Sequence, residues 1–493
     1  MRNTTGANHT FYRATPAVAL LLLMLAGCAS TPLEPWHSKK LVEEFTVDKA
    51  ETVVTLADYQ ALEERLFEEL ETKVYNLVDT GPQYALVRYS RGSAADPRVD
   101  NPNWNRSFEM TQSDPLGAVL LLHGMSDSPY SLRTIARTLH DQGYHVLALR
   151  MPGHGTAPSG LRFVNAEDMI AAVRLGMRHL SGFAGDLPIH IIGYSTGGTL
   201  ALDYTLDATA GIVSPVPTSL ILISPAIRIH GAARLARFQD RISVVPGLGR
   251  MSWLSVEPEF DPYKYNSFAT NAGHVVHTLT RSIDGRLEER AADGPVDMPP
   301  IIVFKSTVDS TVTTEAVVDN LLSRLDRNRH RLVLFDINRT TAKSTLLIDD
   351  PGPLTYRLMS DDQLPFAVTF VVNESPESTR VVARHKQPFA AAATETEELD
   401  MAWPFGVMSL SHVALPFPPD DPLYGGVRPE RETRVYLGEL AMKGERGLVR
   451  LPGDWQLRMR YNPFYPVVEK GIVEWIANSE GRRSSGMPVE AAN

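Results

Sequence analysis

A serine flanked by glycines lies directly after an apolar run near the middle of the chain. Residues 193–197 follow the pattern G-x-S-x-G, with Ser195 at the centre and Gly193 and Gly197 at its ends. Residues 189–192 predict a buried strand before it, and residues 198–204 predict a helix after it. A serine on a tight strand-to-helix turn is the arrangement of a nucleophile elbow, and glycine relieves the collisions of such a turn. We therefore predict that Ser195 is a nucleophile.

A serine hydroxyl needs a base, and the base needs a carboxylate to orient it. Asp309 follows the apolar segment 301–304, and loops at the carboxyl edge of an α/β sheet hold functional groups. Asp336, near the end of the next apolar segment, is the second candidate for the acid. His412 lies downstream of both, between an apolar approach and a proline-rich loop. We predict that Asp309 and His412 act with Ser195.

Backbone N–H donors for a developing oxyanion are expected beside the serine. The N–H of Thr196 lies at the start of the helix after the elbow, where the helix dipole favours negative charge. We assign the second donor to Met125, in the loop after the apolar segment 118–122. His123 opens that loop ahead of the serine, so we expect it to shape the loop and not to act as the base.

Most of the 14 histidines are expected to have no chemical role. His385 stands among charged residues, which predicts exposure. His274 and His277 are one helical turn apart, a spacing that suits a metal, but no third ligand is indicated nearby. A helix-face interpretation is favoured for this pair, and no metal site is predicted.

Short apolar segments alternate with helical stretches from residue 84 onward. Several segments are apolar without alternation, as expected of strands covered by helices on both faces. The stretches 130–141 and 166–180 have the lengths of βαβ crossovers. The pattern predicts a doubly wound, mostly parallel α/β sheet, with strands at 84–88, 118–122, 145–149, 190–192, 219–223, 301–304 and 331–335.

Three segments stand outside this alternation. Thr55 and Asp58 form a capping box that opens a helix, and Gly81 and Pro82 are expected to end it. Between two of the strands lies a segment with two expected helices, near 232–241 and 271–287, and the aromatic residues Trp253, Phe260, Tyr263, Tyr265 and Phe268. After the last predicted strand, two β-rich pieces at 366–372 and 380–384 could pair as a hairpin.

Together these residues resemble the α/β-hydrolase superfamily, and more narrowly its branch of lysophospholipases, monoacylglycerol lipases and serine aminopeptidases. The resemblance is carried by residues 123–124 and 151–155 after successive strands, the elbow at 193–197, then Asp309 and His412 in that order. It implies an α/β-hydrolase fold with a helical cap insertion over the active site. In the family the histidine closely follows the last strand, whereas here a long insertion precedes it. Either this insertion forms a flap beside the pocket, or the strand at 331–335 is misassigned.

The first residues resemble the signal peptide of a bacterial lipoprotein. Arg2 and Arg13 supply a positive region ahead of a short apolar stretch at 14–25. Residues 25–28 resemble a lipobox that ends in Cys28. The resemblance implies cleavage before Cys28 and acylation of that residue, which would anchor the chain to a membrane. Ala29 in the next position implies the outer membrane, facing the periplasm. A plain secretory signal with a chance cysteine is the alternative.

These features divide the chain into successive segments. We expect a signal peptide at 1–27, a tether at 28–54, an N-terminal helix at 55–81, the hydrolase core at 82–227 and 299–338, the cap at 228–298, the second insertion at 339–404, the C-terminal part of the core with the histidine at 405–478, and a tail at 479–493.

The sequence predicts a serine hydrolase that cleaves carboxylic esters, such as lipid esters, through an acyl-enzyme and without a cofactor. A net charge of −10 and a pI near 5.8 argue against a nucleic-acid partner. Because Cys28 is the only cysteine, intrachain disulfides and thiolate metal clusters are excluded. Two alternatives remain: a serine aminopeptidase in which Glu257 and Glu259 bind a free amino terminus, and a catalytically silent envelope lipoprotein that uses the scaffold for binding.

Overall fold

The computed structural model describes residues 32–228, 249–309, 311–327, 329–342, 347–348, 350–428, 434–438 and 459–481. The expected signal peptide with Cys28, and the expected helix at 232–241, lie outside the described residues. Among the helices that the structure describes, none combines the length and the apolar character needed to cross a membrane.

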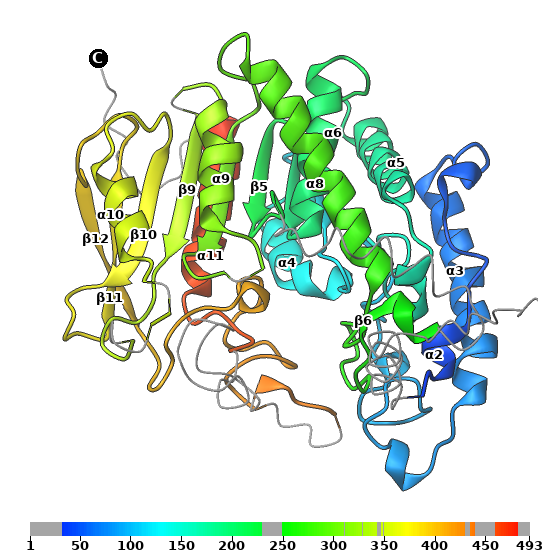
Figure 1. Ribbon diagram of the computed structural model, residues 1–493. Coiled ribbons are helices and arrows are strands. Elements are labelled where there is room, and N and C mark those ends of the chain that lie inside the picture. Colours follow the sequence, from blue (N-terminus) through cyan, green and yellow to red (C-terminus); the bar gives the residue numbers. More distant parts are fainter. Residues whose placement is uncertain are drawn as a thin grey trace, which may run out of the picture.

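A central sheet of ten strands runs through the described chain in the order β1-β3-β2-β4-β5-β8-β9-β10-β11-β12 (Figure 1). From β3 to β10 every neighbouring pair is parallel, whereas β1, β11 and β12 pair antiparallel. The strands are β1 (Phe108–Met110), β2 (Ala118–Leu122), β3 (His145–Leu149), β4 (Ile189–Tyr194), β5 (Ser219–Ile223), β8 (Ile301–Ser306), β9 (His330–Phe335), β10 (Ala367–Asn373), β11 (Arg380–Lys386) and β12 (Glu395–Ala402); β6 (Trp253–Ser255) and β7 (Phe268–Ala269) form a separate pair.

Helices cover both faces of this sheet. Successive residues of β2 pack in two different cores, Leu120 with one and Leu121 with the other, so the strand is buried on both sides. Side chains of α5, α6, α8 and α9 fill the first core, and those of α4 and α11 fill the second. The predicted doubly wound sheet is confirmed. The helices are α2 (Pro35–Ser38), α3 (Leu56–Lys73), α4 (Arg133–Asp141), α5 (Ala166–Ala184), α6 (Thr196–Thr209), α8 (Thr270–Ala291), α9 (Thr314–Asn320), α10 (Gly352–Ser360) and α11 (Tyr465–Ser479).

The N-terminal helix begins where the sequence predicts but ends earlier. Thr55 Oγ1 accepts the N–H of Asp58, and the Asp58 carboxylate accepts the N–H of Thr55, so the capping box is present. The helix ends at Lys73, because Val74 leaves helical geometry and a short 3₁₀ turn follows. Its apolar side packs against α5 and the core, so α3 supports the end of the sheet that carries β1.

The predicted strand at 84–88 is wrong. Pro82–Tyr84 form a 3₁₀ turn. The buried side chain of Arg88 then joins the following segment to the loops that contain Asn105 and Gly155. This guanidinium donates to Asn105 Oδ1 at 3.0 Å and to the carbonyl of Gly155 at 3.2 Å. The first strand of the sheet is instead the three-residue β1, which is too short for its period to be read from sequence.

The insertion after β9 is neither a flap nor the result of a misassigned strand. β9 lies at His330–Phe335, one residue longer than predicted, and β10 pairs with it in parallel. β11 and β12 continue the sheet antiparallel, and β10 with β11 forms the predicted hairpin. β10 satisfies its backbone hydrogen bonds against β9 on one side and β11 on the other, so the insertion enlarges the core sheet (Figure 1).

Helix α8, expected within the cap, belongs to the core layer. Its residues Val275, Leu279, Ile283 and Leu287 are buried in the same core as α5 and α6. The spacing of these four residues forms one apolar stripe, which must be buried against the sheet layer. The aromatic residues of the segment also pack against the rest of the chain, Trp253 and Tyr265 in a cluster with Leu161, and Tyr263 in another with Tyr130.

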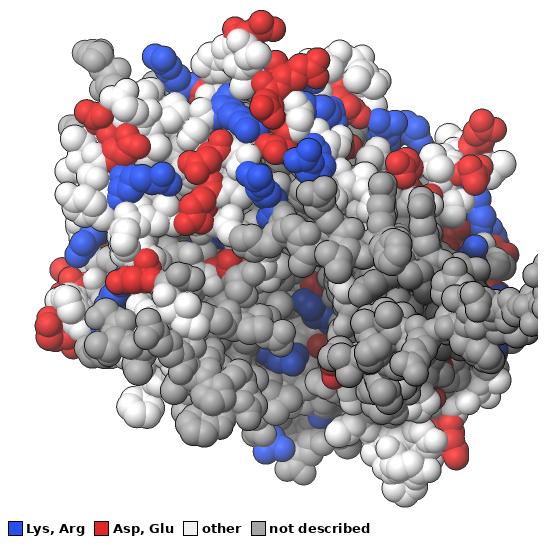
Figure 2. Space-filling model, viewed as in Figure 1, with Lys and Arg blue, Asp and Glu red and all other residues white. Residues whose placement is uncertain are grey.

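Charge is mixed over the described part of the face shown in Figure 2. Acidic and basic side chains are interspersed over the region of α8 and α9, and neither sign forms a continuous field there. This distribution gives no electrostatic track for a nucleic-acid backbone on the described part of this face.

Candidate active site

Ser195 occupies a sharp turn between β4 and α6. Its φ of 53° is positive, a conformation that non-glycine residues rarely adopt. The turn is held by two backbone bonds: Ser195 N–H donates to the carbonyl of Ile223 at 2.9 Å, and Ala226 N–H donates to the carbonyl of Ser195 at 3.1 Å. Both partners lie at the end of β5 or just beyond it. The elbow geometry predicted for residues 193–197 is therefore present, with Ser195 half-buried at the carboxyl edge of the sheet.

Glycine is required at both ends of this turn by close backbone approach. A Cβ on Gly197 would lie 2.0 Å from the carbonyl oxygen of Leu122, and one on Gly193 would lie 2.5 Å from the carbonyl oxygen of Gly197. These contacts are with main-chain atoms, which cannot rotate away as a side chain can. The two glycines thus let the elbow pack directly on the end of β2.

Asp309 and His412 are brought together although they are far apart in the sequence. His412 Nδ1 lies 2.8 Å from Asp309 Oδ2, and both side chains are almost completely buried. The ring of His412 is 5.5 Å from that of Tyr194, the residue directly before Ser195. A Nδ1–H that donates to a carboxylate leaves Nε2 as the atom that can accept a proton. The structure thus places the three predicted residues at one edge of the sheet; their chemical roles remain a prediction.

A buried lysine that the sequence analysis did not use completes the environment of Asp309. Lys305 Nζ lies 2.8 Å from Asp309 Oδ2, and neither side chain is exposed. The other carboxylate oxygen accepts the N–H groups of Thr311 and Val312 at 2.8 and 3.1 Å. Burial alone would raise the pKa of Asp309, but the charges of His412 and Lys305 outweigh it and hold that pKa well below its usual range. Asp309 is therefore a fixed anion.

The feature of the sequence that indicates a role for Lys305 is its position in the chain. Lys305 stands near the end of β8, after four apolar residues and four residues before the candidate acid. A lysine in a buried strand must find an anion or a carbonyl, since an unpaired buried ammonium is costly. Its second contact, from Nζ to the carbonyl of Val312 at 2.6 Å, closes the same loop.

His412 reaches the carboxyl edge because the chain returns from β12 to the end of β9. Asn338, just after β9, donates its backbone N–H to the carbonyl of Met408 at 2.7 Å and its side-chain Nδ2 to that of Val407 at 2.8 Å. A short 3₁₀ turn, His412–Ala414, follows. The position of the histidine is thus fixed relative to β9 despite the insertion, which departs and returns at the same edge.

The loop after β2 lies against the elbow. A Cβ on Gly124 would be 3.1 Å from Ser195 Cβ, and the neighbouring Met125 packs on the core beside it. Thr196 is the first residue of α6, so its N–H is one of those that the helix itself leaves without a partner. Both predicted oxyanion donors therefore flank Ser195 in the chain fold, and their function stays a prediction.

His123 has the structural role expected of it. Its Nε2 accepts the N–H of Met151 at 3.0 Å, while Nδ1 contacts the carbonyl of Gly124 at 2.9 Å. Burial, with the neighbouring His154, holds the pKa of His123 well below its usual range. This imidazole is neutral and joins the loops that follow β2 and β3.

The second candidate for the acid is engaged elsewhere. Asp336 is held by Arg339 through two hydrogen bonds, Nε to Oδ2 at 2.8 Å and Nη2 to Oδ1 at 3.0 Å.

His385, expected to be exposed, is half-buried on β11, where Nδ1 lies 3.0 Å from Thr369 Oγ1. His274 and His277 lie half-buried on α8, as the helix-face interpretation expects.

The two glutamates considered for an aminopeptidase differ in their surroundings. Glu259 is buried, and its carboxylate accepts the backbone N–H groups of Asn266 and Ser267 at 3.0 and 2.7 Å. Burial raises the pKa of Glu259 to about 7, although these hydrogen bonds act against it. Glu257 is exposed. The carboxylate of Glu259 therefore stabilises its own loop by accepting these backbone N–H groups.

Comparison with known proteins gives a family match and several relatives. Residues 113–336 match the family model described as serine aminopeptidase, S33. A thermostable monoacylglycerol lipase of Bacillus sp. (strain H-257) is 33% identical over 133 residues, which are 27% of this chain and 52% of the relative. A carboxylesterase of Bacillus subtilis (strain 168) is 34% identical over 122 residues, 24% of this chain and 48% of the relative. The chain thus spans about half the length of the curated relatives it matches.

Solved structures give further but weaker similarity. A lipolytic enzyme from the metagenome-derived pair LipS and LipT has a TM-score of 0.38 at 18% identity, covering 47% of this chain and 87% of its own. The monoacylglycerol lipase of Paleococcus ferrophilus has a TM-score of 0.36 at 17% identity, covering 47% and 88%. The strand order and the family match support the α/β-hydrolase superfamily.

Proposed function

We propose that this chain, which has the α/β-hydrolase fold, is a serine hydrolase of carboxylic esters. The observation that carries the proposal is the hydrogen bond between His412 Nδ1 and Asp309 Oδ2, at the sheet edge where Ser195 forms a strained elbow. A histidine held in one tautomer by a buried carboxylate is what a serine nucleophile requires.

The proposed reaction proceeds through an acyl-enzyme. Ser195 Oγ attacks the ester carbonyl while His412 Nε2 takes its proton, and the same proton then passes to the leaving alcohol. Asp309 keeps Nδ1–H oriented and stabilises the imidazolium. The N–H groups of Thr196 and Met125 hold the oxyanion. Water then attacks the acyl carbonyl while His412 Nε2 takes its proton. The ester bond to Ser195 Oγ breaks, the carboxylic acid leaves, and Nε2 returns the proton to Ser195 Oγ.

The proposed substrate is a small or lipid-like carboxylic ester. The relatives named as a monoacylglycerol lipase and a carboxylesterase favour this class over peptides. The internal engagement of Glu259 also counts against a site for a free amino terminus, since its carboxylate already accepts two backbone N–H groups.

An activity-based label tests the nucleophile and the substrate class together. A fluorophosphonate should label Ser195, identified by peptide mass spectrometry, and p-nitrophenyl butyrate should be turned over at least about 100-fold faster than alanine p-nitroanilide. Heat-denatured protein is the control for non-specific labelling. Labelling at another serine would overturn the assignment of Ser195, and turnover of the anilide alone would establish the aminopeptidase. If the protein is neither labelled nor turns over either substrate, the result would favour the catalytically silent binding protein.

We also propose that acylated Cys28 anchors the protein at the bacterial outer membrane, facing the periplasm. The support is the lipobox-like sequence at residues 25–28 with Ala29 after it. Several acyl chains hold a protein firmly, because each buried methylene contributes about 0.8 kcal/mol. The Cys28→Ala variant should move from the membrane pellet to the soluble fraction after cell fractionation. Retention of this variant in the pellet would contradict the lipid anchor.

A further inference from the structure

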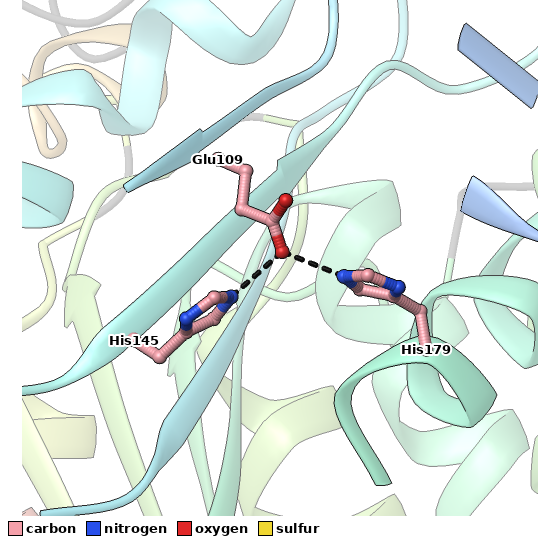
Figure 3. A group of neighbouring side chains, drawn as sticks. All are labelled: Glu109, His145 and His179. Atoms are coloured by element: carbon pink, nitrogen blue, oxygen red, sulfur yellow. Dashed lines mark hydrogen bonds and ion pairs between the residues drawn. The ribbon is translucent and has the colours of Figure 1, made fainter. Parts of the chain in front are cut away.

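Three side chains with metal-ligating atoms converge at the end of the sheet that carries β1. They are Glu109 on β1, His145 on β3 and His179 on α5 (Figure 3). Glu109 Oε1 lies 2.7 Å from His145 Nε2 and 2.6 Å from His179 Nε2. All three ligand atoms lie within 4.8 Å of one another. The mechanism proposed above uses none of them.

The fold, not the sequence spacing, creates this cluster. In the antiparallel pair of β1 and β3, Glu109 stands opposite Leu147, so His145 is its diagonal neighbour on the same face of the sheet. Helix α5 packs over that face, in contact with β2 and β3, and brings His179 to the same point. His145 begins β3, whereas Ser195 follows the end of β4, and these strands are parallel to the β2 between them. The cluster therefore lies at the edge opposite the candidate active site.

The donor atoms of the cluster suit a cation. Glu109 Oε1 contacts the Nε2 atoms of both imidazoles. A carboxylate only accepts hydrogen bonds, so each imidazole presents Nε2–H to it. When each ring carries its proton on Nδ1 in place of Nε2, the two nitrogens and the oxygen become three ligands that face one point.

We propose that Glu109, His145 and His179 bind one Zn²⁺-class divalent ion. Two imidazole nitrogens with one carboxylate oxygen suit zinc, whereas Mg²⁺ and Ca²⁺ prefer all-oxygen sites. Zinc–ligand bonds of about 2.0–2.1 Å place tetrahedral ligands roughly 3.3 Å apart, so the Oε1–Nε2 pairs need to open by about 0.6–0.7 Å. Glu109 and His179 are 21% and 29% exposed, which leaves access for the ion and for a water as fourth ligand.

The site would tie the edge of the sheet to its covering helix. The ion joins the short strand β1 and the helix α5 to β3, and it takes no part in ester hydrolysis. Among the described residues, His145 Nδ1 has no hydrogen-bond partner, so this ring lacks the hydrogen bond that orients a ligating imidazole in tight zinc sites. The expected affinity is therefore micromolar, weaker than that of a closed structural zinc site.

Calorimetric titration with zinc chloride tests the site. The protein, prepared without a histidine tag and dialysed against a chelator, should bind one Zn²⁺ with a Kd on the order of 1–10 µM, and its Tm should rise by a few degrees. Glu109→Gln and His179→Ala should each weaken binding about 100-fold or more. His140→Ala is the matched control, because His140 is a partly exposed histidine outside the cluster. Turnover of p-nitrophenyl butyrate should be the same with and without zinc.

Three results would overturn the proposal. They are the absence of saturable binding at one ion per chain, an unchanged affinity in both Glu109→Gln and His179→Ala, and binding of Mg²⁺ as tight as that of Zn²⁺. His179 lies on the partly exposed side of α5, so its variant folds even where the Glu109 variant does not. Because the readout is metal affinity, failure here is distinct from failure of the proposed ester hydrolysis.

Discussion

Replacement of Ser195 by alanine is expected to lower kcat/KM for p-nitrophenyl butyrate by about 10⁴-fold or more. The substitution removes the only atom that can form the acyl-enzyme in the proposed mechanism, and losses of this size follow when the nucleophile of a serine triad is removed. Alanine keeps the Cβ of the strained elbow, where φ is 53°, so the fold should be retained. Steady-state kinetics, with circular dichroism to verify folding, measure the effect.

The matched control for this variant is Ser113→Ala. Ser113 is exposed and precedes β2, at the opposite edge of the sheet from the elbow. Its replacement should leave kcat/KM within about twofold of the wild type, as expected for a surface substitution. Turnover by Ser195→Ala within tenfold of the wild-type value would rule out Ser195 as the nucleophile.

Replacement of Lys305 by methionine is expected to lower the free energy of unfolding by about 3–5 kcal/mol. Lys305 and Asp309 form a fully buried ion pair at 2.8 Å, and removal of one partner leaves the other charge uncompensated. Methionine fills most of the volume of lysine, so the loss of charge dominates over the loss of packing. Urea denaturation, monitored by tryptophan fluorescence, measures the change.

Another buried lysine provides the control. Lys386 on β11 is 1% exposed, and its Nζ has no hydrogen-bond partner among the residues that the structure describes. Lys386→Met should therefore leave stability unchanged or raise it slightly. A double-mutant cycle of Lys305→Met with Asp309→Asn should give a coupling energy above about 1 kcal/mol, as residues in one network do. Equal losses in Lys305→Met and Lys386→Met, or no coupling, would contradict the ion pair.

The same pair determines how stability depends on pH. The pKa of Asp309 in the folded state lies below its unfolded value of about 3.9. Its contribution to stability is therefore complete above about pH 4 and is lost as the pH falls below that value. In the Lys305→Met variant the pKa of Asp309 is lowered less, because the charge of Lys305 is gone. The free energy of unfolding of this variant should therefore fall less steeply with acid than that of the wild type.

The elbow and most of the parallel strands could be predicted because their signals are local. Strands β2, β3 and β5 lie at the predicted bounds, since each is an unbroken apolar segment between turns. Ser195 was indicated by its two glycines, and the clash distances at Gly193 and Gly197 explain why no larger residue fits. Asp309 and His412 were predicted from the order in which a carboxylate and a histidine are expected to follow the serine.

What the sequence could not provide was the pairing of distant segments. The attachment of β10 to the edge of β9, and with it the return of the chain to His412, depends on which strand edge is open in the folded sheet. The place of α8 in the core layer likewise depends on which helix covers each strand.

The sequence by itself indicated the candidate residues of this chain: a serine on a strained turn, with a candidate acid and a candidate base in the required order. Tertiary structure alone decided what surrounds these residues. Lys305 became the partner of Asp309, and Glu109, His145 and His179 met from three elements. The physical reason is that turn strain and strand burial depend on neighbouring residues, whereas contacts across a sheet or between sheet and helix arise from register and packing over long sequence separations.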